Sequence, residues 1–414
     1  MKIRSITSFW DPLQQVGLLK IPAEFAQFRA ESARRFQDAG FEVQTTRLST
    51  VDFPRYLDCA NGLKGTQAQV QDVESQSVEA GFGYLSFGAV DSCEGDEIFD
   101  MIPELLAATK TAFFNGVMAA RKMMYPHCVR KCAQIIRANR EIEPEGFANL
   151  RFAALAQVPP GGPFFPSSYF KGGPPAFALA IECADEAVQA FESARSLGEA
   201  RRLLIERLNG KARQMELIAF SLSKEFDFEF GGFDFSLAPF PQDEISLGAA
   251  LELLGIPNLG ESGSLAAAAF VADTLDLGQW KRAGFNGLML PVLEDTRLAQ
   301  RSAAGILSVQ DLLMFSAVCG AGLDTVPLPG DVSEDDVYSL LLDIATLATR
   351  LHKPLTARLM PIPGKAAGEE THFDFGFFVN GRVLGIKSGA AGGLLSAAEV
   401  VDLKPRHTRL EFKE

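Results

Sequence analysis

Long apolar runs are missing from this sequence of 414 residues. No stretch reaches the roughly 18 consecutive apolar residues that a bilayer-spanning helix needs. The Ala-rich run that begins at Ser264 is interrupted by Asp273 and Asp276. The first 15 residues have a polar beginning and lack an apolar core of signal-peptide length. These absences predict a cytoplasmic protein without a membrane partner.

Basic residues are also in short supply. Lys and Arg number 39 against 52 Asp and Glu, which gives a formal net charge of −13. Because nucleic-acid binding needs a basic surface, we expect no nucleic-acid partner. The hydrophobic content of 47% is ample for a sizeable core. No Ser-rich linker or repeat divides the chain, so we predict a single domain over residues 1–414.

Cysteine is sparse, with six residues in the whole chain. That density excludes a disulfide scaffold. Cys128 and Cys132 lie one helical turn apart and follow His127, so they could begin a zinc site. No second ligand pair lies at a usable spacing, and small buried hydrophobic side chains are the favoured alternative.

Familiar catalytic and nucleotide-binding motifs are absent as well. The sequence contains no G-x-x-x-x-G-K-[ST] loop and no G-x-G-x-x-G after a strand. It also contains neither H-E-x-x-H nor G-x-S-x-G. Dinucleotide binding therefore has no support in the sequence.

What the sequence does contain is an alternation of apolar, β-rich runs with helical patterns. About ten runs are expected to be strands: residues 2–8, 41–49, 84–90, 112–119, 151–158, 176–182, 228–239, 287–294, 323–329 and 355–363. A helix over 333–353 is expected to begin with Ser333 as its cap. This pattern predicts an α/β fold with a largely parallel sheet, either closed into a barrel or left as an open doubly wound sheet.

One segment, residues 158–177, is rich in Pro, Gly and aromatic residues. Its aromatic side chains favour a packed structural loop over a flexible tether, with a lid or plug as the alternative. Residues 374–414 are less regular, and we assign them no structure.

Three carboxylates lie where strands are expected to end: Glu182, Asp234 and Glu294. At the carboxyl ends of parallel strands they would converge on one rim. Such a group could bind a divalent cation or act as an acid–base pair. The alternative is that each carboxylate caps the next helix, as Asp295 would cap the helix after it.

Cys319 is expected at the C-terminal end of a helix, followed by Gly320 and Gly322, which allow a positive φ. The helix dipole there opposes a thiolate, so a reactive Cys319 would need a neighbouring cation such as Arg358 or Lys365. A buried structural thiol is the alternative.

Polar residues near this cysteine add a candidate binding site. Asp324 follows in the next strand, and Asp331 is placed to contact the first turn of the helix after it. Arg358 and Lys365, beside a Pro-Gly turn, could form an anion pocket.

Several long motifs together resemble domain-of-unknown-function family 711, also called uncharacterised protein family 0210. They include "RFAALAQVPPGGPFFPSSY", "GGFDFSLAPFP", "GLMLPVLED", "SAVCGAGLDTVPLPGD" and "KPLTARLMPIPGK". The resemblance runs from the start of the chain to about Phe378. It implies a single ten-stranded α/β barrel grouped with the fold of pyruvate formate-lyase.

Glycyl radical chemistry is not expected from this resemblance. The segment "GRVLGIK" contains Arg382, Val383 and Gly385, as the glycine setting of those enzymes does. However, Ile386 replaces the aromatic residue of that setting, and the chain is short for the class. A shared fold does not transfer a reaction.

The sequence therefore predicts an enzyme that acts on a small polar metabolite in a pocket at the strand ends. The predicted catalytic residues are Glu182, Asp234, Cys319 and Asp324. The predicted substrate-binding residues are Arg358, Lys365 and Asp331. A divalent cation held by Glu182, Asp234 and Glu294 is the candidate cofactor. The alternative function is a non-catalytic metabolite sensor or a partner subunit, and in either case the chain could form a homo-oligomer.

Overall fold

The chain forms an α/β structure built on one large sheet of 11 strands. The computed structural model describes residues 1–414 except 15–18, 92–94, 320, 388, 390 and 405–414. The strands are β1 (Lys2–Trp10), β2 (Thr46–Thr50), β3 (Tyr84–Val90), β4 (Ala112–Ala120), β5 (Met123–Met124), β6 (Phe152–Ala156), β7 (Ala176–Glu182), β8 (Glu229–Ala238), β9 (Gly322–Pro329), β10 (Leu355–Ile362) and β11 (Val401–Asp402).

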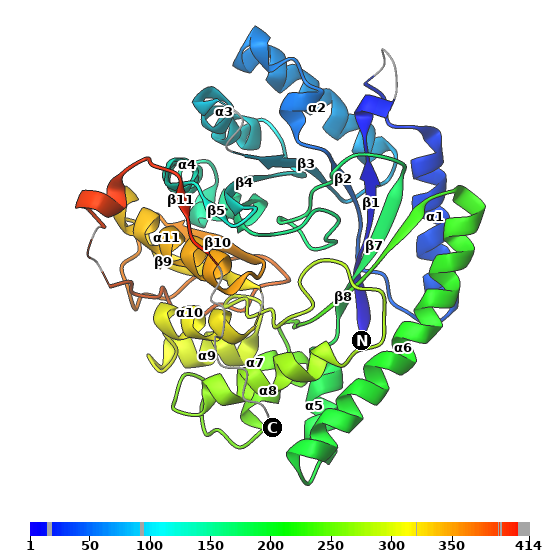
Figure 1. Cartoon of the computed structure of the whole chain (residues 1–414), viewed down its shortest axis with the longest axis vertical. Coiled ribbons are helices and arrows are strands. Elements are labelled where there is room, and N and C mark those ends of the chain that lie inside the picture. Colours follow the sequence, from blue (N-terminus) through cyan, green and yellow to red (C-terminus); the bar gives the residue numbers. More distant parts are fainter. Residues whose placement is uncertain (15–18, 92–94, 320, 388, 390, 405–414) are drawn as a thin grey trace.

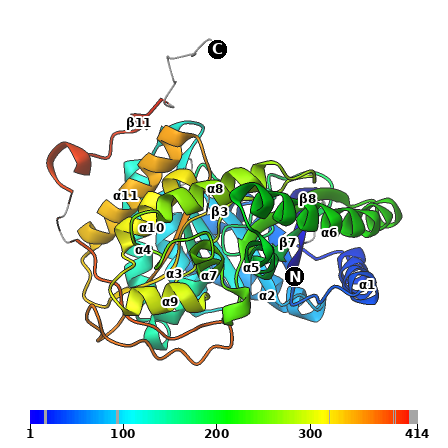
Figure 2. The same ribbon diagram turned by 90° about the horizontal axis from the view of Figure 1, so that it is seen from below.

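Helices lie around the outside of the strands (Figures 1 and 2). They are α1 (Ala23–Asp38), α2 (Leu63–Glu79), α3 (Asp96–Ala107), α4 (Pro126–Asn139), α5 (Ala184–Ser193), α6 (Leu197–Phe226), α7 (Leu247–Glu252), α8 (Ser264–Asp276), α9 (Thr296–Ala303), α10 (Val309–Val318) and α11 (Glu334–Leu351). The main hydrophobic core lies between these helices and the outward face of the sheet, where side chains such as Phe28, Leu48 and Leu341 are fully buried. Within the described ranges, no helix is both long and apolar enough to cross a membrane.

The sheet contains two strand directions. Its main path runs in the order β8-β7-β1-β2-β3-β4-β6-β10-β9. The five strands β1, β2, β3, β4 and β6 are parallel. The β7–β8 pair is antiparallel to β1, and the β9–β10 pair is antiparallel to β6. The starts of β1 to β4 therefore lie at the same end of the sheet as the finish of β7 and β8.

Most of the expected strands are present, but residues 287–294 do not form one. Asn286 has a φ of 47° and Pro291 interrupts the run, so a regular ladder is broken at both places. The segment still connects strands through its backbone. The Met289 amide donates to the Ser236 carbonyl of β8 at 2.9 Å, and the Val292 amide donates to the Asp324 carbonyl of β9 at 3.1 Å.

The helix caps agree with the sequence. Asp295 caps α9 by accepting hydrogen bonds from the Arg297 and Leu298 amides, and Ser333 caps α11 by accepting from the Asp336 amide. The helix before Cys319 ends at Val318, as expected. Each cap satisfies backbone N–H groups that have no partner within the helix.

Residues 158–175 form a loop packed against the sheet, and residues 176 and 177 of the expected segment begin β7. The hydroxyls of Ser5 and Thr7 in β1 donate to the Pro163 carbonyl at 3.1 and 2.8 Å. The Asn115 side chain in β4 donates to the Pro166 carbonyl at 2.7 Å. Polar strand side chains thus satisfy the buried backbone of this loop, because a buried carbonyl without a donor is costly.

The C-terminal segment runs along the outside of α11 (Figures 1 and 2). The Tyr338 hydroxyl donates to the Leu395 carbonyl at 2.7 Å, and the Ala391 amide donates to the Ser339 hydroxyl at 2.8 Å. Within it, β11 pairs with the short β5.

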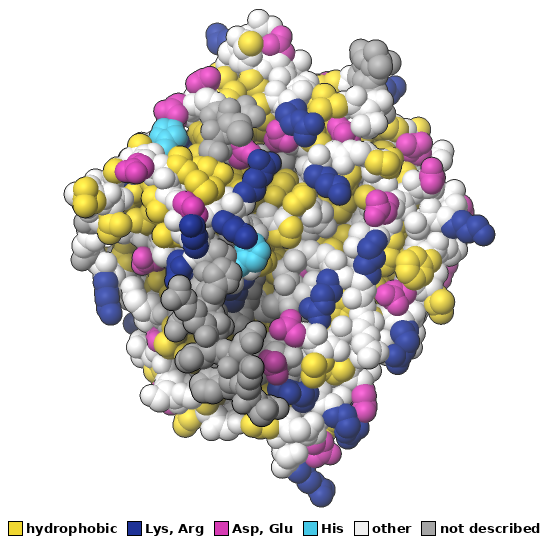
Figure 3. All heavy atoms as spheres, viewed as in Figure 1, with side chains coloured by type: hydrophobic (Ala, Val, Ile, Leu, Met, Phe, Trp, Pro, Cys, Tyr) yellow, Lys and Arg dark blue, Asp and Glu magenta, His cyan; other side chains and the backbone are white. Residues whose placement is uncertain are grey.

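On the face seen in Figure 3, acidic and basic side chains are interspersed. On that face the acidic side chains therefore do not form one continuous negative patch.

Candidate functional site

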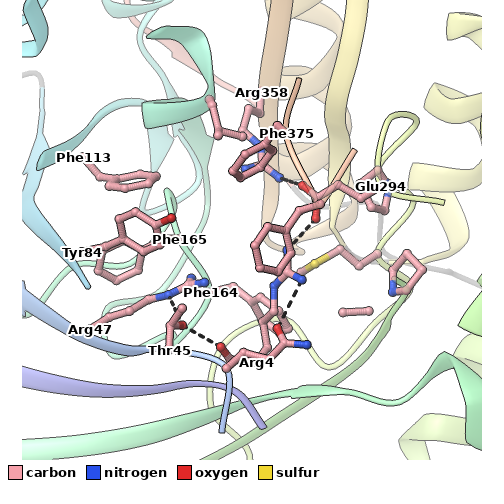
Figure 4. Close-up of a pocket in the computed structure, with 17 residues that line it drawn as sticks. Arg4, Thr45, Arg47, Tyr84, Phe113, Phe164, Phe165, Glu294, Arg358 and Phe375 are labelled. Carbon is pink, nitrogen blue, oxygen red and sulfur yellow. Dashed lines mark hydrogen bonds and ion pairs between the residues drawn. The ribbon is translucent and has the colours of Figure 1, made fainter. Parts of the chain in front are cut away.

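A pocket of about 700 Å³, measured out to its open mouth, lies at the end of the sheet where β1 to β4 begin. Its wall combines aromatic rings with arginines (Figure 4). The aromatic residues are Tyr84, Phe113, Phe164, Phe165, Phe375 and Phe377, and the arginines are Arg4, Arg47 and Arg358.

The two strand directions explain how this wall is assembled. Arg4 and Arg47 lie near the starts of β1 and β2, while Glu182 and Ala238 end β7 and β8. Lys2 of β1 pairs with Glu182 of β7, so these ends meet. If all strands ran parallel, the residues at strand starts and those at strand ends would lie at opposite ends of the sheet.

A chain of ion pairs links five buried or nearly buried side chains beside the pocket. Arg4 donates to Glu182 Oε2 at 3.3 Å and to Glu294 Oε2 at 2.8 Å. Arg358 donates to the other oxygen of Glu294 at 2.8 Å and to Asp324 at 2.6 Å. Both oxygens of Glu294 are therefore occupied by arginines.

Burial and pairing act in opposite directions on these groups. Burial opposes the charge of Arg358, but Asp324 and Glu294 outweigh it and raise its pKa. For Glu182, burial dominates and raises the pKa, although Arg4 and Gln44 oppose the shift. Glu182 Oε1 is buried and has no hydrogen-bond partner among the described residues.

Arg47 differs from the other two arginines because it has no acidic partner. Its side chain is 7% exposed, and no carboxylate of a described residue lies within ion-pair distance. Its Nε donates to the Thr45 hydroxyl at 3.0 Å. Burial, followed by repulsion from Arg4, lowers the pKa of Arg47 to about 9.

Aromatic rings contact the Arg47 guanidinium in place of a carboxylate. The guanidinium carbon lies 5.5 Å from the centre of the Tyr84 ring and 5.1 Å from the centre of the Phe165 ring. Tyr84 is the residue that pairs with Arg47 across β2 and β3, and both side chains line the pocket (Figure 4). Cation–π contact stabilises the charge only in part.

Of the three carboxylates expected to converge, Asp234 lies elsewhere. Glu182 and Glu294 share Arg4. Asp234 instead accepts from the Phe285 and Asn286 amides at 2.7 and 2.9 Å, and from the Ser236 hydroxyl. It is fully buried, and burial raises its pKa to about 6 against the opposing hydrogen bonds. Its place in the structure is to hold the turn after residue 283.

The same geometry does not bring the three expected cation ligands together. No group of three or more His, Cys, Asp or Glu side chains among the described residues is arranged to hold a metal ion. The sequence argument assumed that all strand ends carrying these acids meet at one point. In the structure, Glu182 and Glu294 form ion pairs with arginines that the sequence argument did not place there.

The possible zinc ligands are also accounted for by other contacts. His127 pairs with Asp96 at 2.5 Å on the surface. Cys128 and Cys132 are buried in the main core, where burial raises the pKa of Cys132 well above its usual value. These thiols are in the environment expected of small hydrophobic side chains.

Cys319 lies outside the pocket. It is 3% exposed and belongs to the main core. Burial raises the pKa of its thiol to about 12, although Lys353 opposes the shift. The Lys353 ammonium donates to the Cys319 carbonyl at 2.7 Å. Gly322 has a φ of 98°, while Gly320 lies outside the described residues.

The predicted binding residues are divided between two places. Asp324 and Arg358 belong to the ion-pair chain, and Arg358 lines the pocket. Asp331 and Lys365 lie in adjoining loops, where the Gly330 amide donates to the Lys365 carbonyl at 3.0 Å. Neither of these two residues lines the pocket.

Sequence reasoning missed Arg4 and Arg47. Each lies inside or at the edge of a run expected to be a strand, where charges are unusual. That anomaly was the available signal. These arginines could be connected to Glu182 only once β7 and β8 were known to run antiparallel to β1.

Fold and pocket together define an α/β protein with an arginine- and aromatic-lined pocket at one end of a mixed sheet. The chain belongs to the family described as Uncharacterised ACR (DUF711), whose family model matches residues 1–379.

Similar proteins from several organisms are named UPF0210 proteins. The chain is 32% identical to a UPF0210 protein of Pyrobaculum aerophilum over 351 residues, which is 81% of this chain and 77% of that protein. A UPF0210 protein of Desulforudis audaxviator is 29% identical over 75% of this chain and 73% of its own length. One of Syntrophobacter fumaroxidans is 28% identical over 82% of this chain and 75% of its own length.

Proposed function

We propose that the sheet closes into a barrel of ten strand positions, in which residues 286–293 supply the tenth. The support is their backbone bonding to β8 on one side and to β9 on the other. Pro291 also forms a parallel bridge with Asp324. A closed barrel would leave no exposed edge on this path, and it agrees with the pyruvate formate-lyase-like fold that the resemblance implies.

We further propose that the pocket at the mouth of this barrel binds a small organic anion through Arg47. The observation that carries the proposal is a buried guanidinium without an acidic partner among the described residues. Burying a charge without a partner costs free energy, and a bound carboxylate or phosphate would offset that cost. Arg4 and Arg358 are already paired with carboxylates, so they shape the site. Arg47 is left to donate hydrogen bonds to a bound anion.

A thermal-shift screen with small carboxylates and phosphates at constant ionic strength tests this proposal. A ligand at 100 times its Kd stabilises the folded state by about 2.7 kcal/mol. We expect at least one anion to raise the Tm of the native chain and of the Arg202→Gln control, in which an exposed arginine of α6 is removed. The Arg47→Gln variant should show no such rise. Equal shifts in all three proteins would contradict the proposal.

Catalysis is a second candidate function, and Glu182 is the observation that favours it. Its raised pKa, and an Oε1 that has no hydrogen-bond partner in the described part of the chain, are features of groups that transfer protons. It contacts Gln44 and Arg4, which line the pocket. Catalytic roles for Asp234, Cys319 and Asp324 stay predictions, as do the cytoplasmic location and a homo-oligomer.

Proton nuclear magnetic resonance of a ligand found in the screen would separate the two functions. An enzyme converts the ligand during incubation, and Glu182→Gln should then slow conversion while binding remains. A ligand that binds and stays unchanged in every condition favours a metabolite sensor.

A further inference from the structure

We infer that the ligand of this pocket is a small monocarboxylate with an aromatic body; the inference rests on the proposed function, in which Arg47 holds an anion. Two observations carry it: the charge left free in the pocket and the aromatic rings around that charge.

Among the described residues that line the pocket, one arginine is left without a carboxylate partner and is free to meet a ligand. Arg4 bonds Glu182 and Glu294, and Arg358 bonds Glu294 and Asp324. A carboxylate matches the single guanidinium of Arg47 in charge and in its bidentate geometry. A phosphate dianion would leave a second negative charge without a partner near Glu294.

Cationic ligands are disfavoured by the same network. The acidic side chain that lines the pocket is Glu294, and arginine nitrogens lie 2.8 Å from both of its oxygens. An ammonium group would have to displace one of these arginines. The pocket is therefore suited to an anionic head and not to a zwitterion.

The walls around Arg47 favour a flat apolar body. The Phe113 ring makes T-shaped contacts with the rings of Tyr84 and Phe165, and the ring centres are 5.2 Å apart in each pair. These rings lie on one side of the pocket, and Phe375 lies across from them (Figure 4). Edge and offset contacts between aromatic rings strengthen binding beyond the effect of their buried area, by about two- to tenfold.

The available space limits the size of that body. The pocket measures about 700 Å³ out to its open mouth. Because that volume includes open space at the mouth, it is an upper limit on the size of a bound molecule.

Isothermal titration of the full chain with four probes tests the ligand class. The probes are phenylacetate, cyclohexylacetate, phenyl phosphate and the neutral phenylacetamide. We expect phenylacetate to bind at least tenfold more tightly than phenylacetamide. We expect cyclohexylacetate to bind about two- to tenfold more weakly than phenylacetate, which is the aromatic contribution expressed as a ratio. Phenyl phosphate should bind no more tightly than phenylacetate.

Variants assign the binding to the residues. Arg47→Gln should weaken phenylacetate binding at least tenfold. Arg47→Lys keeps the charge but loses the bidentate geometry of the guanidinium, so it should weaken phenylacetate binding too. Phe113→Leu should weaken phenylacetate while leaving cyclohexylacetate unchanged. Arg202→Gln should leave every affinity as it is.

Failure of this inference is distinguishable from failure of the proposed function. If phenyl phosphate binds more tightly than phenylacetate and still needs Arg47, the monocarboxylate assignment is overturned and the anion site stands. If cyclohexylacetate binds as well as phenylacetate, the aromatic body is overturned. If no anionic probe binds in a manner that depends on Arg47, both proposals fall.

Discussion

At the scale of single residues, Arg47 is the feature with the most direct consequence. Its burial without an acidic partner among the described residues is unfavourable in the ligand-free protein. Removing a residue that has a structural role lowers the stability of the fold. A residue that serves to bind a ligand can instead reduce stability while the site is empty.

We therefore predict that Arg47→Met raises the free energy of unfolding of the ligand-free chain by about 1–2 kcal/mol, because an uncompensated buried charge is replaced by a side chain of similar length. Urea unfolding monitored by circular dichroism measures the change, with Arg202→Met as the surface control. A loss of stability of that size would show that Arg47 has a structural role instead.

Asp234 predicts a pH dependence of stability. Burial raises its pKa to about 6 in the folded chain, above the value of about 3.9 in the unfolded chain. The folded state therefore binds the proton more tightly, and the stabilisation is fully present below pH 4. It is lost as the pH rises through 6, by about 3 kcal/mol in total.

The matched variant is Asp234→Asn, which removes the titration. The difference in unfolding free energy between native chain and variant should fall as the pH rises from about 4 to 7. A difference that stays constant over this range would refute the assignment of this titration to Asp234.

At the scale of elements, the loop 158–175 connects stability to the site. Its carbonyls at Pro163 and Pro166 are bonded by side chains of β1 and β4. The same loop supplies Phe164 and Phe165 to the pocket wall. Residues that hold the loop should therefore affect ligand binding without contacting the ligand.

Asn115→Leu tests this connection. The variant leaves the Pro166 carbonyl without its 2.7 Å donor, and we expect a loss of about 1–3 kcal/mol in unfolding free energy. Anion affinity should fall as well, because the rings at 164 and 165 lose their support. Ser75→Ala, on the exposed face of α2, is the control and should change neither quantity. A stable variant with unaltered affinity would mean that the loop is held by other contacts.

The sequence was sufficient for much of this element-level description. Apolar runs indicated most of the strands, and Asp295 and Ser333 indicated helix starts, because both depend on neighbours in the chain. Residues 287–294 were misassigned because their apolar composition suits a strand, while a left-handed residue at Asn286 and the proline at 291 break the ladder.

The pocket could be predicted only in part, since it depends on strand direction. Glu182, Glu294, Asp324 and Arg358 were expected near one another and are linked by ion pairs. Arg47 could not be connected to them, because hydrophobic periodicity does not tell whether neighbouring strands run parallel or antiparallel.

At the scale of the whole molecule, the proposed closure of the sheet predicts slow hydrogen exchange in an irregular segment. The Met289 and Val292 amides bond to β8 and β9. If these bonds close a barrel, both amides should exchange as slowly as amides within those strands, since opening them requires a large unfolding event.

Native-state exchange followed by mass spectrometry measures this protection. The Glu261 amide, which bonds Asn258 in an exposed turn, is the reference for rapid local opening. Exchange at Met289 and Val292 as fast as at Glu261 would favour an open sheet.

The central claim is that Arg47 is the anion-binding residue of the pocket, and a crystal structure of the chain with phenylacetate tests it most directly. The account predicts carboxylate density within hydrogen-bond distance of the Arg47 guanidinium, with the phenyl ring between Phe113 and Phe375. Density for the ligand at another place, with Arg47 left without an anion, would contradict it.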